Sequence, residues 1–596
     1  MSSVLECNCL FFGGTGGYIN TKILRERMGT EMKKIIPIIV ALVLILLIGG
    51  VAVGSVLLEK YSYSKEEADW DEFYQVSGKE AAIILQDEMV EEKAIVHEGS
   101  CYLDLATVHK YLNEIFYVDM GEQLLLYTTA TDIISAQIGG KTYTSSEGSK
   151  ETDYVICYVE NDTLYVAMEY VELFTNYSFE VFDRHIQVYT EWGTRQVAEI
   201  TKDTAVRVKG GIKSPILKEV VKGEQVEILE QMETWSKVKT EDSVIGYVEN
   251  KRLTEMEEEK ETPVTSYKAP EYTSIALDRK VSLGFHAIGG VGGNSTLGEM
   301  VAKTKGMNVI APTWFSLNDE EGNFRSFGEA SYVSKAHDMG LQVWGVLDDF
   351  NFNNETGANL SVYNVLSSTT KRQYLVQNIT NTALGLGLDG INLDFERLNS
   401  DTGVHFVQFL RELSIQCRAN NLVLSIDNYV PFNFNDYYRL DIQGQVADYV
   451  IIMGYDEHWH GSGDPGSVAS IDYVTGGIER TLEEVPAQKV VNALPFYTIL
   501  WKLDGANVTD EYLTLNNTAD FLNRVGITPE WNEETCQNYA EWNSGNATYR
   551  IWLEDAESIS VKLNVMNAHN IGGVAVWRLG YGTQGVWELL NAYVNS

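Results

Sequence analysis

Cysteine is scarce in this chain, which carries six in 596 residues. They are too few and too scattered for a disulfide scaffold, and no Cys-x-x-Cys pair indicates zinc: Cys7, Cys9, Cys101, Cys157, Cys417 and Cys536. Cys101 and Cys157 either pair within one domain or remain two free buried thiols. His458 and His460 lack an acid or cysteine partner at ligand spacing, so we expect no metal and no cofactor.

Basic residues are also scarce, with 45 Lys and Arg against 84 Asp and Glu and a formal net charge of −39. Nucleic acid is excluded as a partner, because its phosphates need basic side chains. The charge fits a soluble enzyme that acts on a neutral or zwitterionic substrate. The length indicates three or four domains, at about 150 residues for each.

One long apolar run, Ile35–Leu58, contains no charged residue and is long enough to cross a bilayer core of about 30 Å. Basic residues precede it, so we expect 1–34 to be a cytoplasmic segment and everything after the predicted transmembrane helix (35–58) to lie outside. A cleaved signal peptide would have a shorter apolar region. Because the residues before Met28 show no periodic pattern, we hypothesise that translation starts at Met28 or Met32.

The stretch 66–192 contains an internal echo. Residues 101–108 and 124–128 resemble 164–171 and 186–190, with Tyr102 matching Tyr165 and Tyr127 matching Tyr189. The echo predicts two strand–helix–strand units of a small α+β domain. This stretch resembles the copper amine oxidase N-terminal-like domain, a resemblance that implies no copper chemistry. It would serve either in wall binding or as a spacer.

Short strands follow one another in 198–254 and predict a small β-barrel. The order Val-Arg, Lys-Gly-Glu-x-Val, Trp-x-Lys-Val and Gly-Tyr-Val resembles a bacterial SH3 domain. The resemblance implies that the module contacts the cell wall; Trp235 and Tyr247 would line a groove or belong to the core. Residues 255–275 are charged and contain proline, and we expect a linker there.

From 278 to 596, strand-like apolar runs alternate with helical stretches. This alternation predicts a (β/α)8 TIM barrel, with an inserted subdomain between Leu500 and Asn570. We read the glycine-rich segment 289–293 as a flexible loop after the first strand. The eight runs are 281–288, 307–312, 341–347, 390–395, 422–428, 449–454, 490–496 and 572–577.

The fourth run carries the most informative pattern. Side chains alternate along a strand, so Asn392, Asp394 and Glu396 share the face opposite Ile391, Leu393 and Phe395. A row of acids on a buried strand is usually kept for chemistry, although a sheet edge with solvated acids is the alternative. At the mouth of a barrel these acids would meet aromatic residues that end later strands: Tyr455, Tyr497 and Trp577. Acids and aromatic rings together indicate a sugar site.

These motifs resemble glycoside hydrolase family 18: Asp-Gly-Ile-Asn-Leu-Asp-Phe-Glu at 389–396, Met-Gly-Tyr-Asp at 453–456, and a tryptophan in the last strand. The resemblance implies Glu396 as general acid and base, Asp394 as organiser of the substrate acetamide, and Tyr455 as its hydrogen-bond donor. In this family the acetamido oxygen of the substrate is the nucleophile, which implies retention of stereochemistry. Further expected substrate contacts are Asn392, Asp389, Trp577, Asp456, Tyr497 and Trp314.

The module order and the ending Val574–Gly580 look most like the spore cortex-lytic branch, which implies an N-acetylglucosaminidase acting on peptidoglycan. Two alternatives remain open: a chitinase or endo-β-N-acetylglucosaminidase acting on other glycans, and a catalytically idle wall lectin. Asn392 stands where many chitinases have aspartate. A neutral side chain there cannot share a proton with Asp394, so we expect a simpler acid limb in the pH–rate profile.

Overall fold

The computed structural model describes residues 21–262, 265, 267–350 and 360–596, with side chains from residue 35 onward. The chain divides into two compact units. The first holds residues 1–93 and 179–264, and the second holds residues 94–178 and 265–596. This division runs through the stretch 66–192 that the sequence predicts as one α+β domain.

The first unit begins with the long helix α1 (Thr21–Tyr61). Its segment Ile35–Tyr61 is long and apolar enough to cross a membrane, and its side chains are mostly exposed. After the short helix α2 (Trp70–Tyr74), strand β1 (Glu80–Leu85) pairs in parallel with β12 (His185–Tyr189). A small core forms there from Tyr74, Val76, Ala82 and Ile84.

The predicted small β-barrel is present in the first unit. Its strands run in the order β15-β14-β18-β17-β16-β13-β19 around a core that includes Val206, Val226 and Val238. Trp235 and Tyr247 are half-buried. The strands are β13 (Thr194–Glu199), β14 (Thr204–Arg207), β15 (Ile216–Val220), β16 (Gln225–Gln231), β17 (Trp235–Thr240), β18 (Ile245–Glu249) and β19 (Glu257–Lys260).

Strand β19 corrects the expectation of a linker at 255–275. Residues 257–260 pair with β13, and Arg195 donates to Glu259 with an Nη2–Oε2 distance of 2.9 Å. The Glu-rich sequence does not indicate a strand here, because it has no alternation of apolar residues. A strand at the edge of a sheet pairs through backbone hydrogen bonds, and charged side chains are common there. Residues 263, 264 and 266 lie outside the described residues.

The second unit starts with strands that pair antiparallel with one another. Strands β3 (Ser100–Asp104) and β10 (Thr163–Ala167), which begin the two echo segments, pair with each other and place Tyr102 opposite Ala167. Cys101 and Cys157 are both buried free thiols. The other elements are β2 (Glu88–His97), α3 (Leu105–Tyr111), β4 (Tyr117–Asp119), β5 (Leu124–Thr128), β6 (Ile133–Gln137), β7 (Thr142–Ser145), β8 (Gly148–Glu151), β9 (Cys157–Glu160), α4 (Met168–Glu172) and β11 (Ser178–Val181).

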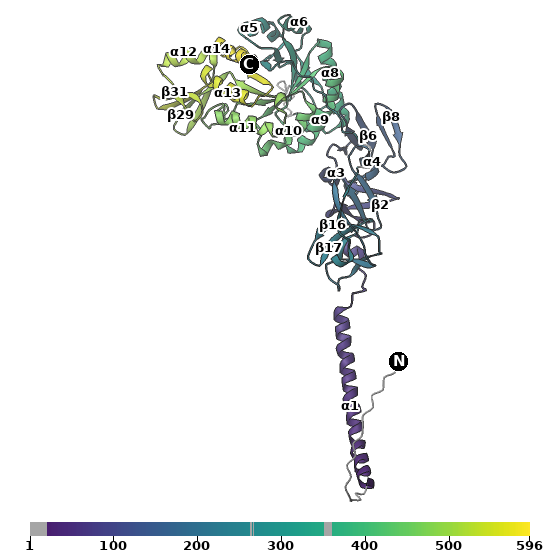
Figure 1. Cartoon of the computed structure of the whole chain (residues 1–596). Helices are drawn as coiled ribbons and strands as arrows, with labels where there is room; N and C mark the ends of the chain where they lie inside the picture. Colours follow the sequence, from purple (N-terminus) through teal and green to yellow (C-terminus); the bar gives the residue numbers. More distant parts are fainter. Residues whose placement is uncertain (1–20, 263–264, 266, 351–359) are drawn as a thin grey trace. The chain divides into compact units, whose positions relative to one another are not determined.

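Within the described residues, eight parallel strands close the predicted barrel in the order β21-β20-β34-β28-β27-β26-β25-β24, with β21 pairing β24. Each confirms one predicted run, and helices surround them (Figure 1). The strands are β20 (Val281–His286), β21 (Val309–Pro312), β24 (Gln342–Asp348), β25 (Gly390–Asp394), β26 (Val423–Tyr429), β27 (Tyr449–Met453), β28 (Val490–Pro495) and β34 (Gly573–Trp577). The helices are α5 (Leu297–Val301), α6 (Ala330–Asp338), α7 (Val362–Leu366), α8 (Thr369–Leu386), α9 (Ser400–Ala419), α10 (Leu440–Val446), α11 (Ile471–Leu482), α13 (Ala556–Ala568) and α14 (Gln584–Val594).

Two additions decorate the barrel. The hairpin β22 (Phe315–Leu317) and β23 (Phe324–Ser326) extends the sheet beside β24. The expected insertion is a five-stranded sheet packed with α12 (Leu515–Val525), and every residue of it is described: β29 (Tyr497–Asp504), β30 (Asn507–Thr514), β31 (Glu530–Asn532), β32 (Gln537–Ser544) and β33 (Ala547–Leu553). Part of the predicted glycine loop is a 3-10 helix, Val291–Thr296.

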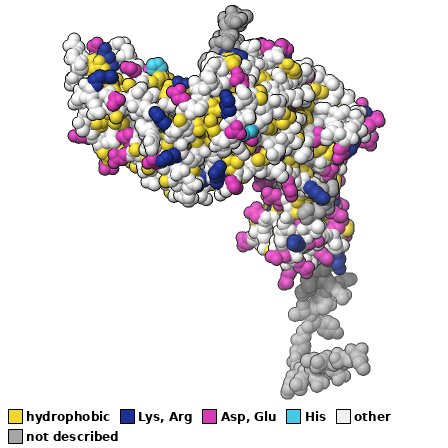
Figure 2. All heavy atoms as spheres, turned by 90° about the horizontal axis from the view of Figure 1, so that it is seen from above, with side chains coloured by type: hydrophobic (Ala, Val, Ile, Leu, Met, Phe, Trp, Pro, Cys, Tyr) yellow, Lys and Arg dark blue, Asp and Glu magenta, His cyan; other side chains and the backbone are white. Residues whose placement is uncertain are grey.

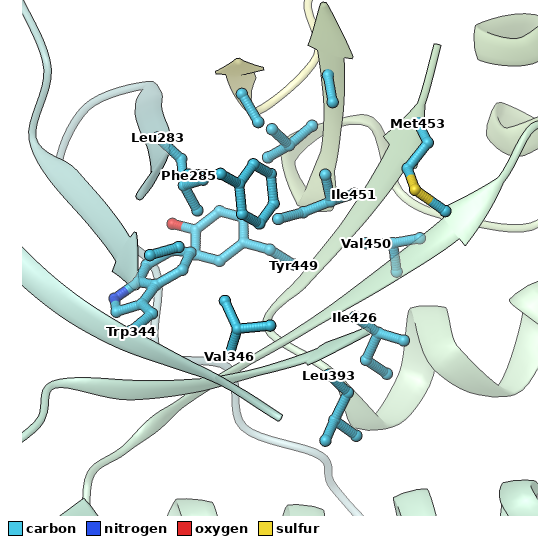
Figure 3. Packing of buried hydrophobic residues seen from close by; sticks show 14 of the residues in the cluster. Leu283, Phe285, Trp344, Val346, Leu393, Ile426, Tyr449, Val450, Ile451 and Met453 are labelled. Carbon is cyan, nitrogen blue, oxygen red and sulfur yellow. The ribbon is translucent and has the colours of Figure 1, made fainter. Parts of the chain in front are cut away.

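Buried apolar side chains of the barrel strands pack against one another (Figure 3). The rings of Trp344 and Tyr449 stack there with centroids 5.4 Å apart, with Val346 and Ile451 nearby. Because successive side chains of a strand point to opposite faces, every second residue along these strands points the same way. The last of them reach the carboxyl ends of the strands. On the outside, acidic side chains are spread over the visible face, as the composition requires (Figure 2).

Candidate active site

A cleft of about 560 Å³ opens at the carboxyl ends of the barrel strands. This is the end of a (β/α)8 barrel where strand termini and loops can combine reactive groups. Carboxyl groups and aromatic rings dominate its walls, with two arginines beside them. The lining includes Phe285, Arg325, Asp348, Asp394, Glu396, Asp427, Tyr429, Met453, Tyr455, Asp456, Trp577 and Arg578.

Strand β25 delivers the acids as its alternation predicts. Helix α8 ends at Gly387, whose φ of 77° is the left-handed conformation that lets the chain turn into the strand. Phe395 then faces outward and stacks on Phe406 and Phe409 of α9, with centroids 6.0 and 5.8 Å away. Asp394 and Glu396 consequently reach the cleft.

Glu396 is held from two sides. The Tyr429 hydroxyl, at the end of β26, donates a hydrogen bond to its carboxylate. Asp349 accepts hydrogen bonds from the backbone N–H groups of Glu396 and Arg397, at 3.1 and 2.9 Å. Burial raises the pKa of Glu396, and the bond from Tyr429 opposes that rise. The carboxyl group therefore keeps a proton to a higher pH than an exposed glutamate does.

Asp394 lies deeper, and its Oδ1 has no hydrogen-bond partner among the described residues. Burial raises its pKa well above the ordinary value, and the neighbouring charges of Glu396 and Asp427 add to the rise. Burial also raises the pKa of Asp427 to about 8. Since carboxyl groups this close titrate together, the cluster holds shared protons at neutral pH.

Asn392 lies beneath the acids rather than in the cleft. It is fully buried, and its Nδ2 donates to Ser425 Oγ at 3.0 Å and to Asp427 Oδ1 at 2.9 Å. It therefore acts on the site by holding Asp427. The expectation of direct substrate contact by Asn392 does not match this position.

The aromatic side of the cleft comes from β20, β27 and β34. Tyr455 follows β27 and is 9% exposed, and Trp577 ends β34 and packs against Phe285 with ring centroids 5.6 Å apart. Asp456 lines the cleft and accepts a hydrogen bond from the Tyr497 hydroxyl. Trp577 is only half-buried, which leaves part of its indole open to the cleft.

Three further expected contacts lie away from the cleft walls. Asp389 precedes β25, at the opposite end of the strand, where its Oδ2 accepts from Val343 N–H at 2.7 Å. Trp314 is completely buried, and its indole N–H donates to Asn294 Oδ1 at 2.8 Å. Tyr497 is 3% exposed; its hydroxyl donates to Asp456, and its ring lies edge-on to that of Tyr455 with centroids 6.3 Å apart. Neither a match to the family motif nor a position at the end of a strand shows how deeply a side chain is buried, because burial depends on packing.

Four cleft residues escape the sequence reasoning: Asp427, Tyr429, Arg325 and Arg578. For two of them a signal exists, because Asp427 and Tyr429 alternate with Ile426 and Asn428 along β26 as the acids alternate along β25. Arg325 comes from the hairpin β22–β23, whose strands are too short to show a period. Arg578 follows the last strand directly.

The histidines of the barrel are engaged elsewhere. His286 is 3% exposed and bonds through its Nδ1 to the Tyr332 hydroxyl at 2.8 Å. His460 contacts the carboxylate of Asp510, which comes from strand β30 and not from a neighbouring position in the sequence. Across the part of the chain that the structure describes, no group of three or more His, Cys, Asp and Glu is arranged to hold a metal ion.

Comparisons with known proteins agree with this arrangement. Residues 352–582 match the glycosyl hydrolases family 18, and residues 202–254 match the bacterial SH3 domain. A cortical fragment-lytic enzyme of Bacillus anthracis is 26% identical over 234 residues, which cover 38% of this chain and 54% of that protein. An uncharacterized glycosylase of Bacillus subtilis, YvbX, is 23% identical over 301 residues, covering 48% of this chain and 84% of that protein.

Among solved structures, the Bacillus cereus spore cortex-lytic enzyme SleL aligns with a TM-score of 0.48 at 21% identity, covering 56% of this chain and 78% of that chain. This chain spans about half the length of the cortical fragment-lytic enzymes that it matches. Most of the barrel, residues 352–582, thus carries a glycoside hydrolase family 18 match, and the module at 202–254 carries a bacterial SH3 match.

Proposed function

We propose that this chain is a membrane-anchored glycosidase that cleaves β-1,4-linked N-acetylglucosaminyl bonds in peptidoglycan outside the cell. The observation that carries the proposal is the pairing of two unequal carboxyl groups in one cleft. Glu396 is hydrogen-bonded by Tyr429 and reaches the cleft half-buried, whereas Asp394 is deeper and keeps an unpartnered oxygen among the described residues.

Glu396 would supply the proton. Its raised pKa keeps more of the group protonated at a given pH than an exposed glutamate would be, as a general acid requires. The proton passes to the glycosidic oxygen while the acetamido oxygen of the substrate attacks C1 and the C1–O bond breaks. The Glu396 carboxylate then takes a proton from water, whose oxygen attacks C1 and opens the cyclic intermediate. Two displacements at C1 give a product with retained configuration.

Asp394 would organise the nucleophile. The Asp394 side chain lines the cleft and its buried Oδ1 lacks a partner among the described residues, so the carboxyl group has a free position to accept the N–H of the substrate acetamide. An ionised Asp394 would also stabilise the positive charge of the intermediate. The Tyr455 hydroxyl would bind the acetamido carbonyl, and Trp577 would form the floor beneath the sugar ring.

Peptidoglycan is favoured as the substrate by charge. Arg325 and Arg578 line the cleft beside the acids. Muramyl residues carry a lactyl carboxyl group and peptides with further carboxylates, which arginine binds well, whereas chitin is neutral. The names of the relatives, which describe lysis of cortical fragments and spore cortex, support the same substrate class.

The other modules fit a place at the wall. We propose that Ile35–Tyr61 spans the membrane with the N-terminus in the cytoplasm, and that the SH3 domain contacts wall peptides. For 66–192, the assignment as a copper amine oxidase N-terminal-like domain stays a proposal, with a role in spacing or wall binding. The remaining expected boundaries, 1–34, 35–58, 198–254 and 278–596, are proposed on the same grounds.

The test is a substrate panel. The full chain in detergent is incubated with peptidoglycan, spore cortex and chitin oligomers, and new reducing ends are identified by mass spectrometry. We expect N-acetylglucosamine ends from peptidoglycan or cortex, and none from a Glu396→Gln variant. Muramic acid ends would refute the assignment, cleavage of chitin alone would favour a chitinase, and binding without cleavage would favour a lectin.

A further inference from the structure

A buried arginine on α9 lacks a partner among the residues that the structure describes. Arg411 is 6% exposed, and its guanidinium has no hydrogen bond or ion pair with any residue that the structure describes. Arginine keeps its charge in proteins, and a buried charge without a counter-ion is strongly unfavourable. Glu114 and Tyr272 act on Arg411 only through longer-range electrostatics.

Other buried or half-buried arginines in this part of the fold have hydrogen-bond partners for their guanidinium groups. Arg372 is completely buried, and two of its nitrogens donate to Glu412 Oε1 at 3.0 and 2.9 Å. Arg418, two turns after Arg411, donates to Ala130 O at 2.7 Å and to Val446 O at 3.1 Å. Arg411 differs from both, although it directly precedes Glu412.

Arg411 lines a pocket of about 410 Å³. The walls all belong to the second unit and come from α3, the chain that follows it into β4, α9 and the segment between β26 and α10. The nitrogens of Arg411 have no partner among the described residues, yet they are not fully enclosed. Because Arg411 lines this pocket, we infer that its nitrogens are open to it. The remaining lining consists of Ala106, His109, Lys110, Glu114, Phe116, Tyr117, Val404 and Arg439.

The charges around the pocket leave it positive. Glu114 supplies the acid of the lining, and its Oε1 accepts from Arg439 Nη2 at 2.8 Å. His109 Nε2 donates to Phe116 O at 2.7 Å, and burial lowers the pKa of this histidine, so it stays neutral. Arg439 also pairs with Asp441 at 2.6 Å, so Arg411 is the lining cation that has no acid partner among the described residues. In a chain with a net charge of −39, this is a local attraction for anions.

We propose that this pocket binds an oxyanion, a carboxylate or a phosphate, which pairs with the guanidinium of Arg411. The planar fork of arginine matches both groups with two parallel hydrogen bonds. The apolar side chains of Phe116 and Val404 would cover the carbon atoms that carry the group. The pocket lies apart from the barrel cleft, so this inference does not depend on the proposed glycosidase activity.

The experiment uses the full chain in detergent and isothermal titration calorimetry. One arm titrates inorganic phosphate, which represents phosphate polymers, and the other titrates N-acetyl-L-alanyl-D-glutamate, which represents wall peptides. We expect saturable binding in at least one arm and a loss of affinity of about 10-fold or more in Arg411→Met, as expected for hydrogen bonds to a charged group. The arm that binds identifies the source of the anion.

Two further variants keep the result interpretable. Val404→Trp fills the pocket mouth from an exposed position and leaves Arg411 in place, so it should also abolish binding. Arg524→Met removes one positive charge from α12, outside the pocket lining, and should bind as the unmodified chain does. The proposal is overturned if the unmodified chain binds neither probe, or if Arg411→Met and Val404→Trp both bind with unchanged affinity.

Discussion

The hydroxyl of Tyr429 should set the pH at which Glu396 loses its proton. It donates a hydrogen bond to the Glu396 carboxylate, which stabilises the charged form and opposes the rise of the pKa by burial. Tyr429→Phe removes that bond and leaves the ring. The charged form loses stabilisation, so the pKa of Glu396 rises, and the basic limb of the rate profile moves to higher pH.

The size of the shift follows from the bond and its exposure. A hydrogen bond to a charged group contributes about 1.5–3 kcal/mol, and one pKa unit corresponds to about 1.36 kcal/mol, which gives about 1–2 units. Tyr429 is 41% exposed, so water replaces part of the lost bond. We therefore expect a shift of about 1 unit.

The assay is kcat as a function of pH on a soluble peptidoglycan fragment. Tyr438→Phe is the matched control, because its hydroxyl donates to Phe395 O at 2.8 Å and not to a carboxyl group. The control should leave the basic limb in place. A basic limb that stays in place, or moves to lower pH, in Tyr429→Phe would refute the assignment of Glu396 as the acid.

Three further predictions follow from the same contacts. Asn392→Asp places a second acid against Asp427, whose pKa is already about 8, and should broaden the acid limb of the pH–rate profile; an unchanged shape contradicts this. Arg372→Met leaves Glu412 buried without its partner and should lower the free energy of unfolding by about 3–5 kcal/mol in urea titrations, whereas the double change with Glu412→Gln should recover part of that loss. Arg325→Gln should lower kcat/KM for a muramyl substrate about 10-fold more than for a chitin oligomer; equal losses would show that it serves only the carboxyl cluster.

Much of the barrel was predictable because each strand is short, apolar and bounded by a helix-length segment, and all eight runs are confirmed. The row of polar residues on β25 was predictable in part, since the alternation of side chains places Asp394 and Glu396 together at the carboxyl end of the strand. It also places Asn392 on that face without showing that Asn392 lies one layer lower, under Asp427. Trp314 ends a strand as Trp577 does, yet packing buries it completely.

Other features depend on contacts between distant segments, which a local pattern does not record. Tyr429 meets Glu396 across two neighbouring strands, and the acidic segment 257–260 becomes a strand only because β13 offers an edge. The pocket at Arg411 needs α3 and α9 together, far apart in the sequence. The expectation of a simple acid limb in the pH–rate profile considered only Asn392 and Asp394. The structure adds Asp427, a further carboxyl group whose pKa is about 8.

The central claim is that Glu396 works with a nucleophile supplied by the substrate. The most direct measurement is proton NMR of the first product from a soluble N-acetylglucosaminyl oligomer, recorded before mutarotation. The account predicts the β anomer, because two displacements at C1 retain configuration. Initial release of the α anomer would show a single displacement by water and would contradict the mechanism.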